Sequence, residues 1–458
     1  MSRLAVLGTL LPALMCSTAF AADVLQDAVI VEDAPAFTLT GTAGIVGFNL
    51  ADFDSGVFGA TDDSLLWGGM IGISGSGALD QYNGWDVVLG FNAFAAFAGG
   101  DSSSSRWTAD GPGTLIISGV STPGGVNSID LDTDNDTPSG TVNIVSNNPQ
   151  GGGAETDDPA TASGGTNNVG FVGPANTGNS FILGAVTTGP GSAAAYGTIA
   201  DTDGGIFIAT GDIDGLTVQT SVSRDLIYTG ADLTLGLGGD LQDGVVAHVY
   251  AGPSYRGLFQ DYDTDININI AEVGEDTVVT LPDLTISRLD EVDTNYLGGV
   301  VGGNLLFGAN DGLVFRLGVE GGVYSAMASW TGTDTYSTCC GDFGPDPEDE
   351  EFQGGLSPDL TVTSDSVSEN FDSELAFAVR GNGGVTWGLD ANTAVTLGGS
   401  IEYLSKVASV QHGELTTWTP GGADDAAWDE TDGPPPDTVV SWGSMVNFAL
   451  TASLTGHF

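Results

Sequence analysis

Aspartates at alternate positions are the residues of this chain whose spacing comes nearest to a metal-binding motif. The clearest run contains Asp130, Asp132 and Asp134, and Ca²⁺ in proteins takes about six to eight hard oxygen ligands of this kind. A calcium loop of the EF-hand type would need a glycine at its sixth position and a glutamate at its twelfth, where the sequence has Thr141. The run therefore predicts either a loosely bound Ca²⁺, the one cofactor that the sequence suggests, or a surface hydrated by carboxylates.

Histidines are the other candidates for chemistry, and the chain has only His248, His412 and His457. His412 lies in the loop 408–437 near Glu414 and the pair Asp424 and Asp425, so this loop is the place where a histidine and carboxylates come closest in the sequence. No glycine-rich phosphate loop, metal-binding histidine pair or Ser–His motif accompanies it. The sequence therefore predicts that the protein is not an enzyme.

The charge balance is extreme, with 60 acidic and 8 basic residues and a formal net charge of −52. Such a field repels nucleic acid and attracts cations. Because 41% of the residues are hydrophobic, the chain also has enough apolar side chains to cover a large surface, which excludes a purely disordered acidic polymer.

The first residues have the form of an export signal. Arg3 precedes an apolar stretch over 4–15, and Ala19-Phe20-Ala21 is a small-x-small cleavage site, so we expect a signal peptide at 1–21. The apolar stretch is too short for a membrane-spanning helix. The adjacent Cys339 and Cys340 then belong to a chain in an oxidising compartment and predict a vicinal disulfide, with a metal site as the alternative.

Alternation of apolar and polar residues is the strongest structural pattern, and it is clearest at the end of the chain. One face of this segment is polar, and the other carries Val440, Trp442, Val446, Phe448, Leu450, Leu454 and Phe458. A final strand of this kind, ending on an aromatic residue, resembles the terminal strand of bacterial outer-membrane β-barrels. The resemblance implies that Phe458, Leu454 and Leu450 are an assembly signal read by the barrel-assembly machinery. The acidic stretch 22–36 similarly resembles the periplasmic lead-in of opacity-type outer-membrane proteins.

The same alternation recurs upstream, and the connections between the alternating segments are short and long in turn. The predicted strands lie within 37–48, 65–76, 84–98, 227–237, 245–256, 293–307, 313–323, 375–387, 395–403 and 440–458. The long connections are 49–64, 99–224, 257–292, 331–373 and 408–437. Outer-membrane barrels have short periplasmic turns and long extracellular loops. We therefore predict an all-β fold in which 37–458 forms an antiparallel transmembrane β-barrel of about ten strands, with eight or twelve as alternatives, long acidic extracellular loops, and an extracellular insertion at 99–224.

Several charged residues fall on the inward face of these predicted strands. Charges in a narrow barrel are costly unless they are paired, so we expect an ion-pair network in the lumen. This network either fills and stiffens the interior or selects solutes. Its predicted members are Asp232, Arg256, Arg316, Glu320, Arg380, Glu402 and Lys406.

Three functional hypotheses follow for a protein of the bacterial outer membrane. The first is a narrow porin-like channel or structural barrel whose surface loops attract cations and contact lipid and lipopolysaccharide. The second is a surface adhesion or interaction protein that acts through 99–224. The third is a rim protease, because the loop around His412 resembles the His–Asp sites of ten-stranded outer-membrane aspartyl-type proteases, although no matching motif is present. The sequence indicates no oligomeric state.

Overall fold

The computed structural model describes most of the chain after residue 36, and every element in it is a β-strand. The described residues are 37–62, 65–120, 128–134, 141–147, 160–163, 169–170, 185–187, 193–200, 205–211, 213–269, 283–308, 312–339, 359–364, 366–390, 392–421, 425–429 and 438–458. Within these ranges, no helix could carry the chain across a membrane. The predicted signal peptide 1–21 and lead-in 22–36 lie outside them.

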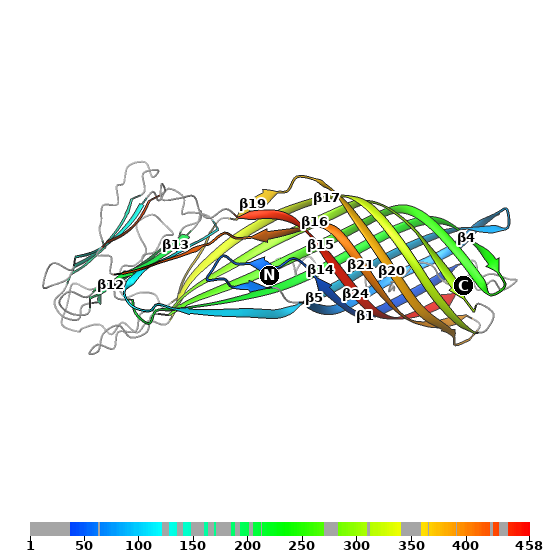
Figure 1. The fold of residues 1–458 in the computed structure, drawn as a ribbon, viewed down its shortest axis with the longest axis horizontal. Helices are drawn as coiled ribbons and strands as arrows, with labels where there is room; N and C mark the ends of the chain where they lie inside the picture. The colour runs from blue at the N-terminus through cyan, green and yellow to red at the C-terminus, as the bar shows by residue number, and fades with distance from the viewer. Residues whose placement is uncertain are drawn as a thin grey trace.

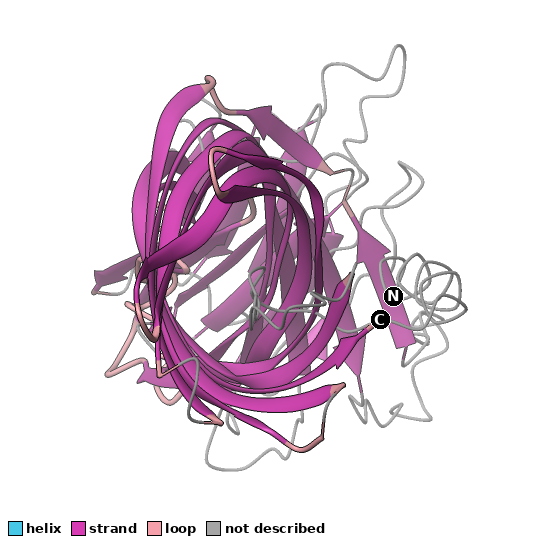
Figure 2. Ribbon diagram, turned by 90° about the vertical axis from the view of Figure 1, so that its right-hand side faces the viewer, coloured by secondary structure: helices cyan, strands magenta, loops and turns pink. Residues whose placement is uncertain are grey.

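Long antiparallel strands form a ring (Figures 1 and 2). They are β1 (Thr38–Asn49), β4 (Leu66–Tyr82), β5 (Trp85–Thr108), β14 (Thr217–Gln242), β15 (Val245–Asn269), β16 (Asp283–Phe307), β17 (Leu313–Cys339), β20 (Glu374–Gly388), β21 (Thr393–Gln411) and β24 (Val439–His457). Their order is β16-β15-β14-β5-β4-β1-β24-β21-β20-β17, and β17 pairs again with β16. The predicted all-β architecture, with a ring of about ten antiparallel strands, is confirmed.

The tight connections all lie at the end of the ring that also holds the last residue. The hairpin between β4 and β5 turns at Asn83 and Gly84, whose φ angles of 53° and 83° are those that an Asn-Gly turn adopts. The hairpin between β14 and β15 turns at Gly244, with φ of 76°. At the same end, Phe458 exchanges backbone hydrogen bonds with Phe37, which joins the two ends of the described chain.

The two faces of the wall change chemistry along the length of the strands. Near the tight turns of β15, the outward Val249 is 55% exposed and the inward Arg256 is buried. Further along the same strand, the outward Asp263 is exposed and the inward Ile266 is fully buried. The register with β16 is continuous over this stretch, so the strand does not rotate. The wall is therefore apolar outside and polar inside in one half, and polar outside and apolar inside in the other.

This change of chemistry explains why several strands are longer than predicted. Residues 257–269 and 283–292 were expected in a long loop but belong to β15 and β16. Likewise, 331–339 continue β17, and the ends of the predicted insertion 99–224 belong to β5 and β14. In these extensions the outward residues are polar. A search for strands with an apolar outward face therefore assigns the extensions to loops.

Shorter strands form a second structure at the end of the barrel remote from the tight turns (Figure 1). One sheet contains β10 (Val169–Gly170), β11 (Ala185–Thr187), β12 (Ala193–Ala200), β13 (Gly205–Gly211), β6 (Gly113–Ser118) and β22 (Thr416–Pro420). Another contains β23 (Asp425–Asp429), β7 (Ser128–Asp134), β8 (Thr141–Asn147) and β9 (Ala160–Ser163). We call these two sheets the head. The pair β2 (Phe53–Asp54) and β3 (Thr61–Asp62) is separate, and β18 (Asp359–Thr363) and β19 (Val367–Asn370) pair with β17.

The interior next to the head is filled by apolar side chains. Leu115 and Phe207 from the head pack in one buried cluster with Ile266 and Ile286 from the wall. A second cluster joins Phe53, which stacks on Tyr262 at 4.3 Å between ring centroids, to Trp330 and Val410. Removing these side chains from water stabilises the head on the wall, because each fully buried large apolar side chain contributes roughly 1.5–3 kcal/mol.

Candidate functional site

An ion-pair network occupies the middle of the barrel interior, where the inward face is polar. The Arg256 guanidinium donates to Asp232 at 2.6 Å and lies 3.5 Å from Glu320. Asp232 also accepts hydrogen bonds from Ser254 and Asn92. The three charged side chains are 2%, 4% and 13% exposed, so Asp232 depends on this arginine for compensation, whereas Glu320 also has Arg380 as its direct cross-strand partner.

Two tyrosines extend the network across the interior. Tyr228 of β14 donates to Glu402 of β21 at 2.7 Å, and Tyr250 of β15 donates to Glu320 of β17 at 2.9 Å. Four strands separate β14 from β21 in either direction round the ring, so the first of these bonds spans its full width. We use the name lumen network for Asp232, Arg256, Glu320 and Glu402 with their tyrosine partners. It forms a bridge of side chains from wall to wall.

The structure places the other predicted members of this network differently. Arg380 is the direct cross-strand partner of both Glu320 and Glu402, so it lies between two carboxylate positions. Arg316 lies nearer the tight turns, where it lines a pocket together with Arg380.

Lys406 is not on the inward face, and its predicted role in the network is wrong. It has a φ of 57° at a β-bulge where the register shifts between Ser405 and Val407. A bulge inserts one residue and breaks the alternation of the strand. The Lys406 ammonium therefore lies on the partly exposed surface, 3.5 Å from Glu374, while its backbone carbonyl accepts a hydrogen bond from Tyr296.

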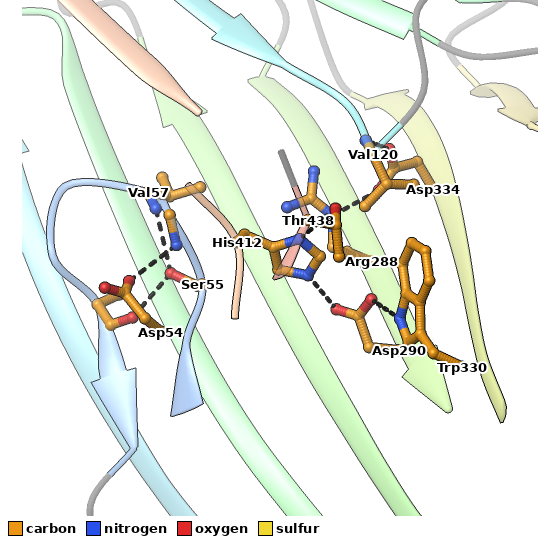
Figure 3. A network of polar contacts seen from close by, with 12 residues as sticks. Asp54, Ser55, Val57, Val120, Arg288, Asp290, Trp330, Asp334, His412 and Thr438 are labelled. Carbon is orange, nitrogen blue, oxygen red and sulfur yellow. Dashed lines mark hydrogen bonds and ion pairs between the residues drawn. The ribbon is translucent and has the colours of Figure 1, made fainter. Parts of the chain in front are cut away.

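A second set of buried polar contacts, which we call the rim network, lies next to the head (Figure 3). His412 Nε2 and Asp290 Oδ2 are 2.8 Å apart, and both side chains are fully buried. Asp290 also accepts a hydrogen bond from Trp330, and His412 Nδ1 lies 3.2 Å from the Thr438 hydroxyl. A His–Asp pair thus exists, but its acid is Asp290 on β16 rather than a neighbour in the sequence.

Arg288 completes the rim network and ties the head to the wall. Its guanidinium donates to Asp334 at 2.8 Å, and Asp334 accepts the backbone N–H of Val120, just after β6, at 2.7 Å. Burial alone would lower the pKa of Arg288, but the carboxylates of Asp334 and Asp290 outweigh it and raise that pKa above its ordinary value. Arg288 therefore keeps its charge, and its contact with Asp334 holds the segment after β6 in place.

These rim residues were missed at the level of sequence. Arg288, Asp290 and Asp334 lie in stretches that were expected to be loops. The signal that could have located the extended strands is alternation of the opposite sense, with the apolar Ile266 and Ile268 on the inward parity and Asp265 and Asn267 on the outward one.

The outward face beside the rim network is acidic. Partial desolvation by its neighbours in the wall, together with the carboxylates of Asp225 and Asp265, raises the pKa of Asp263 above its ordinary value. Asp225 is the direct cross-strand partner of Asp261, which in turn pairs with Glu291. Like charges placed opposite one another destabilise a sheet, so this row needs screening by cations.

The remaining predicted site residues have mixed outcomes. Leu450, Leu454 and Phe458 all point outward, with 64%, 55% and 74% of their surfaces exposed. Cys339 is the last residue of β17, but Cys340 lies outside the described residues, and so the predicted disulfide stays a prediction. Asp130, Asp132 and Asp134 fall in β7, where side chains are outside the description. Among the side chains that are described, no group of His, Cys, Asp or Glu is arranged to hold a metal ion.

Comparisons with known proteins give only distant likenesses. No protein-family model matches the chain. No curated protein matches it either. Among solved structures, the outer membrane protease OmpT from Escherichia coli aligns at a TM-score of 0.32 and 10% identity, covering 92% of this chain and 96% of that one. The Pseudomonas putida toluene transporter TodX gives 0.22 and 8%, with 96% of each chain covered. A Pseudomonas aeruginosa FadL homologue gives 0.20 and 5%, covering 96% of this chain and all of the other. Scores this low support no inference about this chain.

Proposed function

We propose that this chain is an outer-membrane β-barrel with a closed lumen that holds an acidic β-structured head at the cell surface. The change of chemistry along β15 supports the membrane assignment. Lipid requires apolar side chains outside the wall, and water requires polar ones. The outward Val249 suits the first environment and the outward Asp263 suits the second. The half of the wall near the tight turns is therefore the membrane-spanning half, and the head projects beyond it.

The lumen network is the observation that supports a structural barrel over an open channel. Its bond from Tyr228 to Glu402 crosses the full width of the ring, and the apolar clusters at the head fill the interior beyond it. Small barrels have interiors that side chains can fill. A solute would have to break charge-assisted hydrogen bonds between buried groups, and each such bond contributes roughly 1.5–3 kcal/mol.

Planar-bilayer conductance tests the closed lumen. The folded wild-type protein should give no stable conductance steps. A Tyr228→Ala/Glu402→Ala variant, which removes the bond across the ring, should give more frequent openings and shows that the assay detects this barrel. Long-lived steps from wild type would contradict the proposal.

Surface interaction through the head is the second candidate function. The head is fastened to the wall by the Arg288–Asp334 pair and by a shared apolar cluster, so it is presented as a fixed surface. Thr108 and Thr217 are direct cross-strand partners, so residues 109–216 can be replaced by a two-residue turn without moving either strand. The shortened protein should retain heat-modifiable gel mobility and lose adhesion of the cells to their target surface. Unchanged adhesion would eliminate this function.

A further inference from the structure

A small hollow opens into the barrel interior on the side of the tight turns. Gly384 of β20 and Gly398 of β21 are direct cross-strand partners, and both lie on the inward parity of their strands. Without side chains, they leave space between the rows above and below. Arg316 is the partner of Gly384 on one side, and Thr451 is the partner of Gly398 on the other. The two glycines are thus the middle pair of one cross-strand row, which runs from Arg316 on β17 through Gly384 and Gly398 to Thr451 on β24. We call the space over them the glycine hollow.

The side chains round this hollow are hydrogen-bond donors. Arg316, Arg380 and Asn382 line it together with the hydroxyl groups of Thr40, Thr396, Ser400, Thr451, Ser453 and Thr455. Four of these hydroxyl groups also share a hydrogen bond with another hydroxyl group: Thr40 with Thr455, Thr396 with Thr386, and Ser453 with Thr42. No Asp or Glu is among the described residues that line it, in a chain with 60 acidic residues and 8 basic ones. Guanidinium groups have donors only, and amides and hydroxyl groups can also donate. A cavity with this lining suits an anion.

Buried amides next to the hollow support the same conclusion. Asn304 is the cross-strand partner of Gly318, which in turn pairs with Asn382, so the two amides flank a glycine. Asn304 is only 4% exposed, and both polar atoms of its side chain lack a hydrogen-bond partner within the described structure. Buried polar groups in proteins are nearly always satisfied, by protein, water or ligand. Of these two amides Asn382 lines the hollow, so this row has hydrogen-bonding capacity at the edge of the site.

We propose that the glycine hollow binds a small oxyanion, of the phosphate or carboxylate type. The Arg316 guanidinium matches the two oxygens of such a group, and the Thr451 hydroxyl and Asn382 amide can donate to it from the facing strands. The site is independent of the closed state of the lumen, because the hollow lies on the tight-turn side of the bond from Tyr228 to Glu402. It would give the barrel a ligand site that faces the periplasm.

Calorimetric titration of the detergent-folded full chain tests this site, with inorganic phosphate and acetate as separate probes at constant ionic strength. At least one probe should bind saturably with one site per chain, and the probe that binds identifies the oxyanion class. Arg316→Gln should weaken binding about tenfold or more, because it removes a charge-assisted contact. Lys406→Gln removes the same charge from the outer surface and should leave binding unchanged.

Thr451→Val provides a test that does not alter charge. It keeps the shape of the side chain and removes one hydroxyl group, so affinity should fall roughly two- to tenfold. Heat-modifiable gel mobility checks that each variant is folded. The proposal is overturned if neither probe binds saturably, if Arg316→Gln and Lys406→Gln weaken binding equally, or if a folded Thr451→Val variant binds as wild type does.

Discussion

Replacing Arg256 by methionine should destabilise the barrel far more than loss of an ordinary ion pair. The side chains of Arg256 and Asp232 are 2% and 4% exposed, and Glu320 is 13% exposed. Methionine retains most of the apolar volume but leaves the buried Asp232 without the cation that binds it, and it removes one of the two arginines near Glu320. Removal of one partner from a buried pair costs about 3–5 kcal/mol. We therefore expect the free energy of unfolding of Arg256→Met to fall by about that amount.

The cost should come mainly from the uncompensated carboxylate of Asp232, and a second substitution separates this effect from lost packing. Arg256→Met/Asp232→Asn removes the nearer charge as well, so it should recover part of the loss. Lys406→Met breaks the pair with Glu374, whose side chains are 37% and 42% exposed, and should cost about 0–1 kcal/mol.

Urea unfolding in lipid vesicles, followed by heat-modifiable gel mobility, measures these differences. The reasoning fails if Arg256→Met loses no more stability than Lys406→Met. It also fails if the double variant is no more stable than the single one, because the loss would then come from packing.

Three further predictions test the rim network and the membrane boundary. His412→Ala leaves Asp290 with one hydrogen bond fewer in a buried site, so it should lower the free energy of unfolding by about 1–3 kcal/mol and speed proteolysis near the head. The control Glu414→Ala changes an exposed residue and should do neither. Equal digestion rates for the two variants would contradict this prediction. Under the proposed membrane assignment, Val249→Arg places a charge in lipid and should cost about 2–4 kcal/mol, whereas Asp263→Arg on the same face of β15 should cost little. Similar costs would show that the boundary is misplaced. Because the pKa of Asp263 is raised in the folded state, the folded protein holds the proton more tightly, and stability falls as pH rises from the ordinary aspartate value through the raised one. Asp263→Asn should therefore be more stable than wild type near neutral pH and lose that advantage in acid, as thermal melts across this range would show; an advantage independent of pH would refute the assignment.

The sequence was sufficient to predict the wall of the barrel, because strands with one apolar and one polar face carry a period of two that the chain repeats many times. It was not sufficient where the environment of a strand changes. Ile266 and Asp263 keep the parities of β15, but their chemistry is reversed, and a rule that requires apolar residues outside therefore assigns this stretch to a loop. The prediction that Lys406 faces inward failed for a different reason. A bulge of one residue is not visible in the alternation of the residues before it.

The partner of His412 could not have been found from spacing at all. Asp290 lies 122 positions earlier in the chain, and only the closure of the wall brings β16 to the segment after β21. Local pattern predicts which face a residue occupies, whereas a pair of this kind depends on the order of strands round the ring.

The few basic residues of this chain have a common location, which links its composition to its architecture. In the part of the chain that the structure describes, five arginines face the interior and five carboxylates lie with them: Arg224, Arg256, Arg288, Arg316 and Arg380, with Asp232, Asp290, Glu320, Asp334 and Glu402. These groups balance, so the net charge of −52 belongs to the rest of the chain. Surface carboxylates are stabilised by water and screened by salt, but an interior carboxylate needs a fixed cation. Most of the few basic residues of this chain compensate interior carboxylates, and the surface carboxylates do not need them. Removal of a single interior arginine should therefore lower the free energy of unfolding more than removal of a surface one.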